Sequence, residues 1–456
     1  MNVLLISTYE MGRQPFGLAS PAAWLRQAGA DVETLDLSQQ PLDKRAVARA
    51  DIVGFYLPMH TATRIATRAI ERVRGLNPGA HLCCYGLYAP MNAGFLRGLG
   101  VKTILGGEFE QPMVRMLQRL STGASTADAD QPEPLVSLAI QKFIVPDREG
   151  LPHLEKYASL TMPDGTSRTV GYTEASRGCK HRCRHCPIVP VYSAHFRIVQ
   201  PDIVLEDISR QVRAGAQHIT FGDPDFFNGI RHAASLVIAL HEMFPSLTYD
   251  VTIKVEHLLE HSRYMGLLKE TGCAFVTTAV ESLDDRVLQF FDKGHTRDDF
   301  IRVLSAARKV DLVLVPTFVA FHPWITLDGY QDLLETIAVL GLVENVAPVQ
   351  LAIRLLIPAG SYLLDLPEVS EIIGPFDETA LSYAWAHPDP RVDALQRDVE
   401  SLVESATRSG ADRRTIFEMV WRRVQPDLGD PGRELPAVPP GRPRSTIPYL
   451  EEPWYC

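Results

Sequence analysis

Three cysteines in one short run constrain this chain more than any other feature of its sequence. Cys179, Cys183 and Cys186 lie in the stretch Arg177-Gly178-Cys179-Lys180-His181-Arg182-Cys183-Arg184-His185-Cys186-Pro187. The spacing Cys-x3-Cys-x2-Cys lets one loop present three thiolates to one centre, which suits three corners of a cubane iron-sulfur cluster. Three ligands leave one iron open, so this iron can bind a small molecule directly.

A structural zinc site is the alternative interpretation of the same run. His181 or His185 would then supply the fourth ligand beside the three cysteines. Structural zinc sites usually take their ligands as two pairs, and no second Cys/His pair at zinc spacing follows in the sequence. The cluster is favoured on these grounds, and the zinc site stays open.

Composition limits the class of protein. The chain has 456 residues, of which 46% are hydrophobic and 22% charged, as expected for a globular protein of two or three domains. A net charge of −10 argues against a nucleic-acid or membrane-surface binder, so we expect a small-molecule substrate. The N-terminus lacks a signal peptide pattern, no apolar stretch of about 18 residues occurs, and seven cysteines suggest reduced thiols. We therefore expect a cytoplasmic protein.

The first 120 residues alternate short apolar runs with helical patterns. This alternation predicts a doubly wound parallel sheet of the flavodoxin type, an α/β fold. The last of the runs leads into Gly106-Gly107-Glu108. The predicted strands are 3–7, 31–37, 51–56, 81–85 and 101–105.

A second alternating region follows the cysteine run. After a predicted linker at 121–165, residues 166–370 contain six candidate strands separated by helical patterns, which predicts an open partial TIM barrel, (β/α)6. A helical region at 371–425 and a proline-rich tail at 426–456 complete the predicted domains. The predicted strands are 171–175, 218–221, 248–254, 274–280, 312–319 and 349–355.

Polar residues at the ends of three barrel strands are candidate ligand-binding groups. The carboxyl ends of barrel strands face the active site, so side chains there are positioned for chemistry. A residue after a strand can also serve only as a helix N-cap, and this remains an alternative for Asp223 and Ser282. The candidates are Asp223, Asp225, Lys254, Glu256, Glu281 and Ser282.

The cysteine run resembles that of the radical S-adenosylmethionine (SAM) superfamily. The resemblance implies a [4Fe-4S] cluster whose open iron chelates the amino and carboxylate groups of SAM. It also implies that Asp223 and Asp225 help to hold the SAM amino group and that His185 occupies the position beside adenine. An external electron donor such as flavodoxin or ferredoxin would reduce the cluster.

The N-terminal region is similar to the cobalamin-binding domain of many such enzymes. The Asp-x-His-x-x-Gly loop, whose histidine ligates cobalt, is absent, and residues 8–17 read Thr-Tyr-Glu-Met-Gly-Arg-Gln-Pro-Phe-Gly instead. Two interpretations follow. The domain either binds cobalamin without a protein lower ligand or is a structural remnant that shapes a substrate cleft.

Along nearly its whole length the chain resembles the CUAEP/CCAEP-tail radical SAM (seleno)protein family. The cysteine run, the segment from Gly222 to Asn228 and the ending Glu-Pro-Trp-Tyr-Cys carry this resemblance. The family tail continues with selenocysteine or cysteine followed by Ala-Glu-Pro. The resemblance therefore implies that Cys456 is the first residue of a catalytic vicinal pair, and a plain cysteine end is the alternative.

These features together predict a radical SAM enzyme. With cobalamin bound, the expected reaction is methyl transfer. A second reaction of the same class transfers the aminocarboxypropyl group of SAM to a thiophilic substrate such as arsenic. An iron-sulfur electron carrier and a zinc-stabilised binding module are the alternatives from other classes, but neither needs a partial barrel with acidic strand ends.

Overall fold

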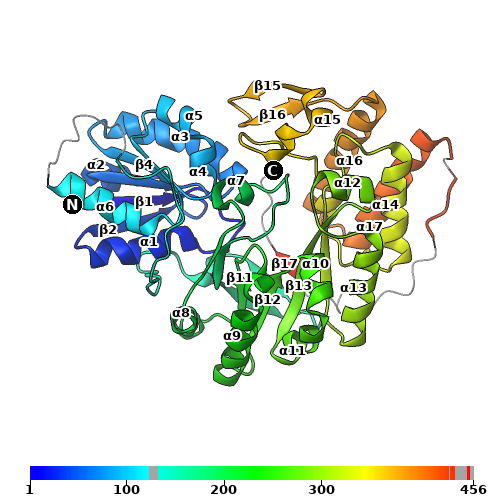
Figure 1. The fold of residues 1–456 in the computed structure, drawn as a ribbon, viewed down its shortest axis with the longest axis horizontal. Helices are drawn as coiled ribbons and strands as arrows, with labels where there is room; N and C mark the ends of the chain where they lie inside the picture. Colours follow the sequence, from blue (N-terminus) through cyan, green and yellow to red (C-terminus); the bar gives the residue numbers. More distant parts are fainter. Residues whose placement is uncertain (123–131, 431, 437–448, 452–456) are drawn as a thin grey trace.

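A computed structural model describes residues 1–122, 132–430, 432–436 and 449–451. Figure 1 shows an N-terminal α/β unit in blue and cyan beside a curled sheet in green, with the C-terminal helices packed on the far side of that sheet. No helix within these ranges is both long enough and apolar enough to span a membrane.

The N-terminal unit is built on a parallel sheet of six strands. Its order, β2-β1-β3-β4-β5-β6, reverses direction between β1 and β3, as in flavodoxin-like folds. This arrangement confirms the predicted doubly wound sheet. The strands are β1 (Asn2–Ser7), β2 (Asp31–Asp36), β3 (Ile52–Tyr56), β4 (His81–Tyr85), β5 (Thr103–Gly107) and β6 (Val136–Ser137).

Helices cover both faces of this sheet, which explains why its central strands are almost continuously apolar. Helices α1 and α6 pack on one face, and α3 to α5 pack on the other. Every residue of β3 is buried as a result. The helices are α1 (Phe16–Gln27), α2 (Lys44–Arg49), α3 (His60–Leu76), α4 (Tyr88–Met91), α5 (Ala93–Gly98) and α6 (Glu110–Ser121).

The second sheet is a half-barrel, and it confirms the predicted fold class. Five of its strands are parallel, and two antiparallel strands extend one edge, giving the order β14-β13-β12-β11-β8-β7-β17. The segment predicted as a linker contributes a strand to each sheet, β6 and β7. The half-barrel strands are β7 (Ser159–Thr161), β8 (Ser167–Thr173), β11 (His218–Phe221), β12 (Thr248–Thr252), β13 (Cys273–Glu281), β14 (Leu314–Phe318) and β17 (Tyr449–Glu451).

The prediction of a strand at 349–355 is wrong. A 3-10 helix, Pro348–Leu351, occupies its first half, and a single parallel bridge joins Phe321 to Arg354. The side-chain Oε1 of Gln350 accepts the backbone N–H of Phe318 at 2.9 Å. The Gln350 side chain thus satisfies a backbone N–H at the edge of β14 that a sixth strand would have paired. The apolar pattern of the segment alone could not reveal that a side chain takes the place of the strand.

Helices on the outer face of the half-barrel form its main core with the C-terminal helices. The predicted helical region at 371–425 contains two long helices, Pro390–Arg408 and Arg413–Val424. It also contains the hairpin β15 (Ile373–Asp377) and β16 (Ser382–Trp385). The helices of this half are α8 (Pro201–Arg213), α9 (Ile230–Met243), α10 (Val255–Glu260), α11 (Met265–Glu270), α12 (Asp285–Phe290), α13 (Arg297–Lys309), α14 (Leu327–Val339), α15 (Pro367–Ser370), α16 (Pro390–Arg408) and α17 (Arg413–Val424).

The tail contributes one strand to the half-barrel sheet. Strand β17 pairs antiparallel with β7, with Tyr449 opposite Thr161 and Glu451 opposite Ser159. Cys456, which the sequence suggested as a catalytic residue, lies outside the described residues.

One buried arginine joins the two sheets. The Arg177 guanidinium lies 2.7 Å from Glu110 Oε1, 3.4 Å from Glu108 Oε2 and 2.6 Å from Glu174 Oε2, and its side chain is 6% exposed. The first two acids belong to the N-terminal unit, and the third follows β8. Burial raises the pKa of Glu108 to about 7, against the lowering effect of Arg177. The guanidinium also lies over the rings of Phe16, Phe109 and Phe143.

Replacing Arg177 with Met should lower the free energy of unfolding by about 3–5 kcal/mol, because it leaves buried carboxylates without their cation. Urea unfolding at neutral pH measures the change. Arg210→Met is the control, since Arg210 pairs with Glu206 on the surface and should matter by less than about 1 kcal/mol. Equal effects of the two substitutions would contradict a structural role for the buried network.

Candidate active site

The cysteine loop begins at a glycine that no other residue can replace without strain. Strand β9 (Ser176–Gly178) ends at Gly178, whose φ is +73°. A Cβ there would lie 2.4 Å from the Tyr192 ring and 2.5 Å from the His195 carbonyl oxygen. The loop ends at helix α7 (Ile188–Tyr192), so both of its ends are fixed. Cys179 and Cys183 are buried and Cys186 is half-buried, all as free thiols.

Neighbouring barrel segments hold the loop in place. Asn228 accepts the backbone N–H of Lys180 at 3.3 Å and donates to the Gly178 carbonyl at 3.5 Å. On the other side, Arg184 donates from Nη1 to the carbonyls of Gln289 and Phe290, each at 3.0 Å. The loop therefore lies across the ends of β11 and β13, where a barrel places its active site.

Asp225 lies between two histidines. Its Oδ2 is 2.6 Å from His257 Nδ1 and 3.3 Å from His181 Nε2, and its Oδ1 accepts the N–H of Phe227 at 3.2 Å. Burial alone would raise the pKa of Asp225, but the two adjacent imidazoles lower it to about 2. Asp225 is thus an N-cap and also an anionic group beside the cysteine loop.

Glu281 is directed toward the cysteine loop by a β-bulge. The register between β13 and β14 shifts at this residue, whose φ is +69°. Its Oε1 lies 3.2 Å from His185 Nε2 and 3.4 Å from Lys293 Nζ. Burial opposes ionisation, but Lys293 and His185 lower the pKa of Glu281 to about 2. The His185 ring packs against Phe291 at a centroid distance of 4.6 Å.

Lys254 and Glu256 contact each other, and Glu256 also lies near His181, the first histidine of the cysteine loop. Lys254 donates to Glu256 Oε2 at 3.2 Å, and the same oxygen lies 3.4 Å from His181 Nδ1. A Cβ at Gly294 would lie 2.6 Å from this oxygen, so glycine leaves room for it.

Asp223 and Ser282 hold local structure near the site. Asp223 accepts the N–H of Ala175 at 2.9 Å and the hydroxyl of Ser176 at 2.5 Å, which ties the end of β11 to the stem of the cysteine loop. Burial raises the pKa of Asp223 to about 7. Ser282 accepts the N–H of Asp284, and Asp284 is the N-cap of α12. Neither candidate is itself a helix N-cap.

The sequence-based candidates omitted three residues of this arrangement: Asn228, His257 and Lys293. Each lies in a segment that connects two half-barrel strands, so its distance from the cysteines depends on tertiary structure. The segment from Gly222 to Asn228 and the Lys293-Gly294 pair were visible as patterns, and they were the available signals.

The geometry of the thiols fits a cluster better than a single ion. Among the described residues, one set of three potential ligands has donor atoms that all lie within 4.8 Å of one another, and it contains Cys179 with His181 and Asp225. Cys183 and Cys186 are not in this set, so the three sulfurs are more widely spread than ligands of one tetrahedral zinc. Three thiols spread along one loop are what three corners of a cubane require.

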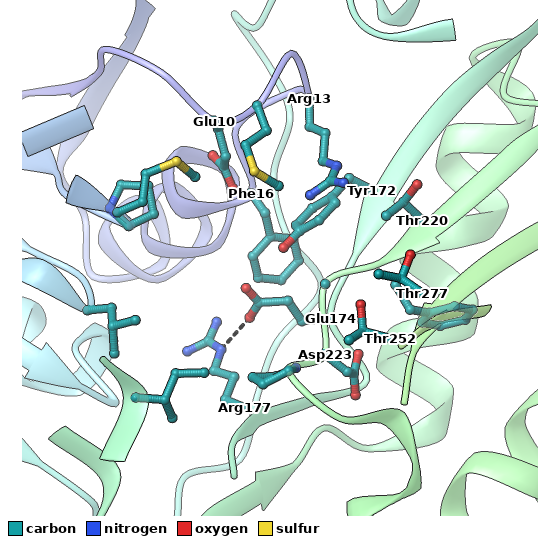
Figure 2. A pocket seen from close by; sticks show the side chains of 18 of the residues that line it. Glu10, Arg13, Phe16, Tyr172, Glu174, Arg177, Thr220, Asp223, Thr252 and Thr277 are labelled. Carbon is teal, nitrogen blue, oxygen red and sulfur yellow. Dashed lines mark hydrogen bonds and ion pairs between the residues drawn. The ribbon is translucent and has the colours of Figure 1, made fainter. Parts of the chain in front are cut away.

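A cavity of about 510 Å³ lies between the two sheets, next to the cysteine loop. Figure 2 shows side chains from both units directed into it. The N-terminal wall includes Glu10, Met11, Tyr56, Leu87 and Gly107. The half-barrel wall includes Glu174, Gly178, Thr220, Asp223, Asp250, Thr252, Thr277 and Thr317.

Comparisons with known proteins agree with this geometry. Residues 173–337 match the family described as the Radical SAM superfamily. An uncharacterized methyltransferase of Pyrococcus horikoshii is 23% identical over 68% of this chain and 70% of its own length. The hopanoid C-3 methylase of Methylococcus capsulatus is 23% identical over 68% of this chain, which spans only 62% of that protein.

Two solved structures share the fold. The radical SAM methyltransferase TsrM from Kitasatospora setae, with cobalamin and a [4Fe-4S] cluster bound, has a TM-score of 0.62 at 18% identity, covering 74% of this chain and 73% of its own. The cobalamin-dependent SAM radical enzyme OxsB, with aqua-cobalamin bound, has a TM-score of 0.67 at 14% identity. The match covers 89% of this chain and 67% of the OxsB chain. Residues 173–337 are therefore a Radical SAM superfamily domain, and the chain is an enzyme of SAM radical chemistry.

Proposed function

We propose that this enzyme is a cobalamin-dependent radical SAM methyltransferase acting on a small molecule. The observation that carries the proposal is that the cavity lies next to both the cysteine loop and the N-terminal sheet. The cavity is lined by Gly178 and Ile188, which flank the cysteine loop, and by residues after β1, β3, β4 and β5 of the N-terminal sheet. Doubly wound sheets bind ligands at this carboxyl edge. One cavity thus lies beside both the predicted cluster and the predicted cobalamin site.

The cavity lining supports cobalamin without a protein histidine on cobalt. Among the described residues, the lining contains no histidine, in agreement with the absence of an Asp-x-His-x-x-Gly loop. Cobalamin is bound in the TsrM and OxsB structures that share this fold, and both of the relatives compared above are named for methyl transfer. Bound cobalamin would supply a methyl carrier between SAM and the substrate.

The side chains around the cysteine loop are proposed to bind SAM. Cys179, Cys183 and Cys186 would hold the cluster, whose open iron supplies a site for the SAM amino acid group. The Asp225 and Glu281 carboxylates are anionic and held by histidines on the loop, so they can orient a cationic ligand without moving. His185, fixed against Phe291, is proposed to lie beside adenine.

The electron donor and the location of the enzyme are parts of the proposal. Lys180 and Arg182 on the cysteine loop are exposed and positively charged, which supports the approach of a negatively charged donor such as flavodoxin or ferredoxin. An oxygen-sensitive cluster and free cysteines favour a reducing cytoplasm. Membership of the CUAEP/CCAEP-tail family, with Cys456 as part of a catalytic pair, rests on the sequence resemblance.

Anaerobic turnover followed by analysis of the SAM products tests the proposed reaction. We expect S-adenosylhomocysteine in amounts that increase with added hydroxocobalamin, because the methyl group leaves SAM through the corrin. Protein with all three loop cysteines replaced by Ala is the control. Methylthioadenosine as the main product would instead indicate aminocarboxypropyl transfer. If the amount of product does not change with added cobalamin, the corrin has no role in the reaction.

Replacing Cys179, Cys183 and Cys186 together with Ala should abolish iron binding, since each thiolate supplies one corner of the cluster. Anaerobically reconstituted wild-type protein should contain about four irons per chain and show thiolate-to-iron absorption. Cys273→Ala is the control, because Cys273 is buried in the barrel core away from the loop. Stoichiometric zinc without visible absorption would establish the zinc site in place of the cluster.

Replacing Asp225 or Glu281 with Ala should weaken SAM binding by about tenfold or more while the iron content is retained, because each removes a charged partner of the ligand. Equilibrium dialysis with radiolabelled SAM measures the affinity. Glu260→Ala is the matched control, since Glu260 is an exposed acid on α10. Unchanged affinity in both site variants would show that the two carboxylates serve only the local structure.

A further inference from the structure

A buried carboxylate on the N-terminal wall of the cavity lacks a partner for one of its oxygens. Glu10 follows β1 and lines the cavity, and Figure 2 labels its side chain together with Arg13 of the same loop. The residue is only 7% exposed. Its Oε2 is buried and has no hydrogen-bond partner among the described residues. A buried acceptor left without a donor destabilises the folded protein, and more so when it is charged.

The loop that carries Glu10 is fixed on both sides. Before Glu10, the Thr8 hydroxyl donates to the Ala62 carbonyl at 2.9 Å. After it, the Gly12 carbonyl accepts the N–H of Ala158 at 2.7 Å, and Gln14 Oε1 accepts a hydrogen bond from Arg148 at 2.8 Å. The Arg13 N–H closes a turn onto the Glu10 carbonyl at 2.9 Å. Glu10 therefore cannot relieve its unsatisfied oxygen by a rearrangement of the loop alone.

The surroundings of Glu10 oppose its ionisation, so its carboxylate form needs an added hydrogen-bond donor. Burial raises its pKa well above the ordinary value, and the carboxylates of Glu174 and Asp36 raise it further. Arg13 and Arg148 act in the opposite direction without cancelling these effects. A bound ligand that presents an N–H group to Oε2 would compensate the cost.

We propose that Glu10 is a ligand-binding residue of the cavity and that, in the cobalamin-bound enzyme, its Oε2 accepts a hydrogen bond from a side-chain amide of the corrin. This inference rests on the proposed function. The periphery of the corrin carries acetamide and propionamide groups, whose N–H donors suit a carboxylate acceptor. Glu10 lies at the carboxyl edge of the N-terminal sheet, where such a sheet binds its ligand. The acid would thus contribute to cobalamin affinity from the loop that lacks the cobalt-ligating histidine.

Hydroxocobalamin titrated into the full-length protein, followed by the corrin absorption spectrum, tests this role. Glu10→Ala should raise the dissociation constant by about tenfold or more, and Glu10→Gln, which keeps an uncharged acceptor, should have an intermediate effect. Glu33→Gln is the matched control, because Glu33 is an exposed acid in the same domain and pairs with Arg49. In the absence of ligand, Glu10→Ala should unfold at the same or a higher temperature than wild type, since an unsatisfied buried group is removed.

The outcomes separate this inference from the function on which it rests. If wild type and Glu33→Gln bind hydroxocobalamin and Glu10→Ala binds it equally well, the inference is wrong and the proposed function stands. A lower unfolding temperature for ligand-free Glu10→Ala would also overturn it, by showing that the acid serves the fold. If wild type itself binds no corrin, the cobalamin part of the proposed function fails, and the Glu10 inference fails with it.

Discussion

The ion pairs of Arg177 are the interaction on which the rest of the structure depends. Arg177 lies two residues before the first cysteine of the loop, and its partners come from the N-terminal sheet as well as from the segment after β8. A guanidinium can serve several carboxylates at once because its donors point in different directions. The same residue therefore sets the position of the cysteine loop and the spacing of the two sheets, and the cavity between the sheets follows from that spacing.

The general architecture could be predicted from sequence because it depends on local signals. Alternating apolar runs and helical patterns define both parallel sheets, and the cysteine spacing defines the loop. Asp225 and Glu281 were selected as site residues because they follow strands and because the resemblance to radical SAM enzymes agrees with these positions. The structure does place both beside the histidines of the cysteine loop. Their binding of SAM stays a prediction, since the position of a carboxylate does not identify its ligand.

Sequence patterns alone could not predict other features of the structure. The apolar segment at 349–355 has the composition of a strand, yet the Gln350 side chain takes over the hydrogen bond that would have recruited it to the sheet. Glu10 is an acid in a loop, which usually indicates an exposed residue, but the tertiary structure buries it. The partners of Arg177 are separated from it by about seventy residues in two of three cases, so no local pattern could connect them.

The pairing of β17 with β7 has a consequence for how this protein folds. The two strands are nearly three hundred positions apart in sequence, so the ladder between them forms a contact of very long range. Loop-closure entropy delays such contacts. During synthesis the half-barrel and its cysteine loop can assemble while the outer edge of β7 still exposes unpaired backbone groups. This edge can pair with other chains until residues 449–451 emerge and cover it, so the period of greatest aggregation risk falls late in synthesis.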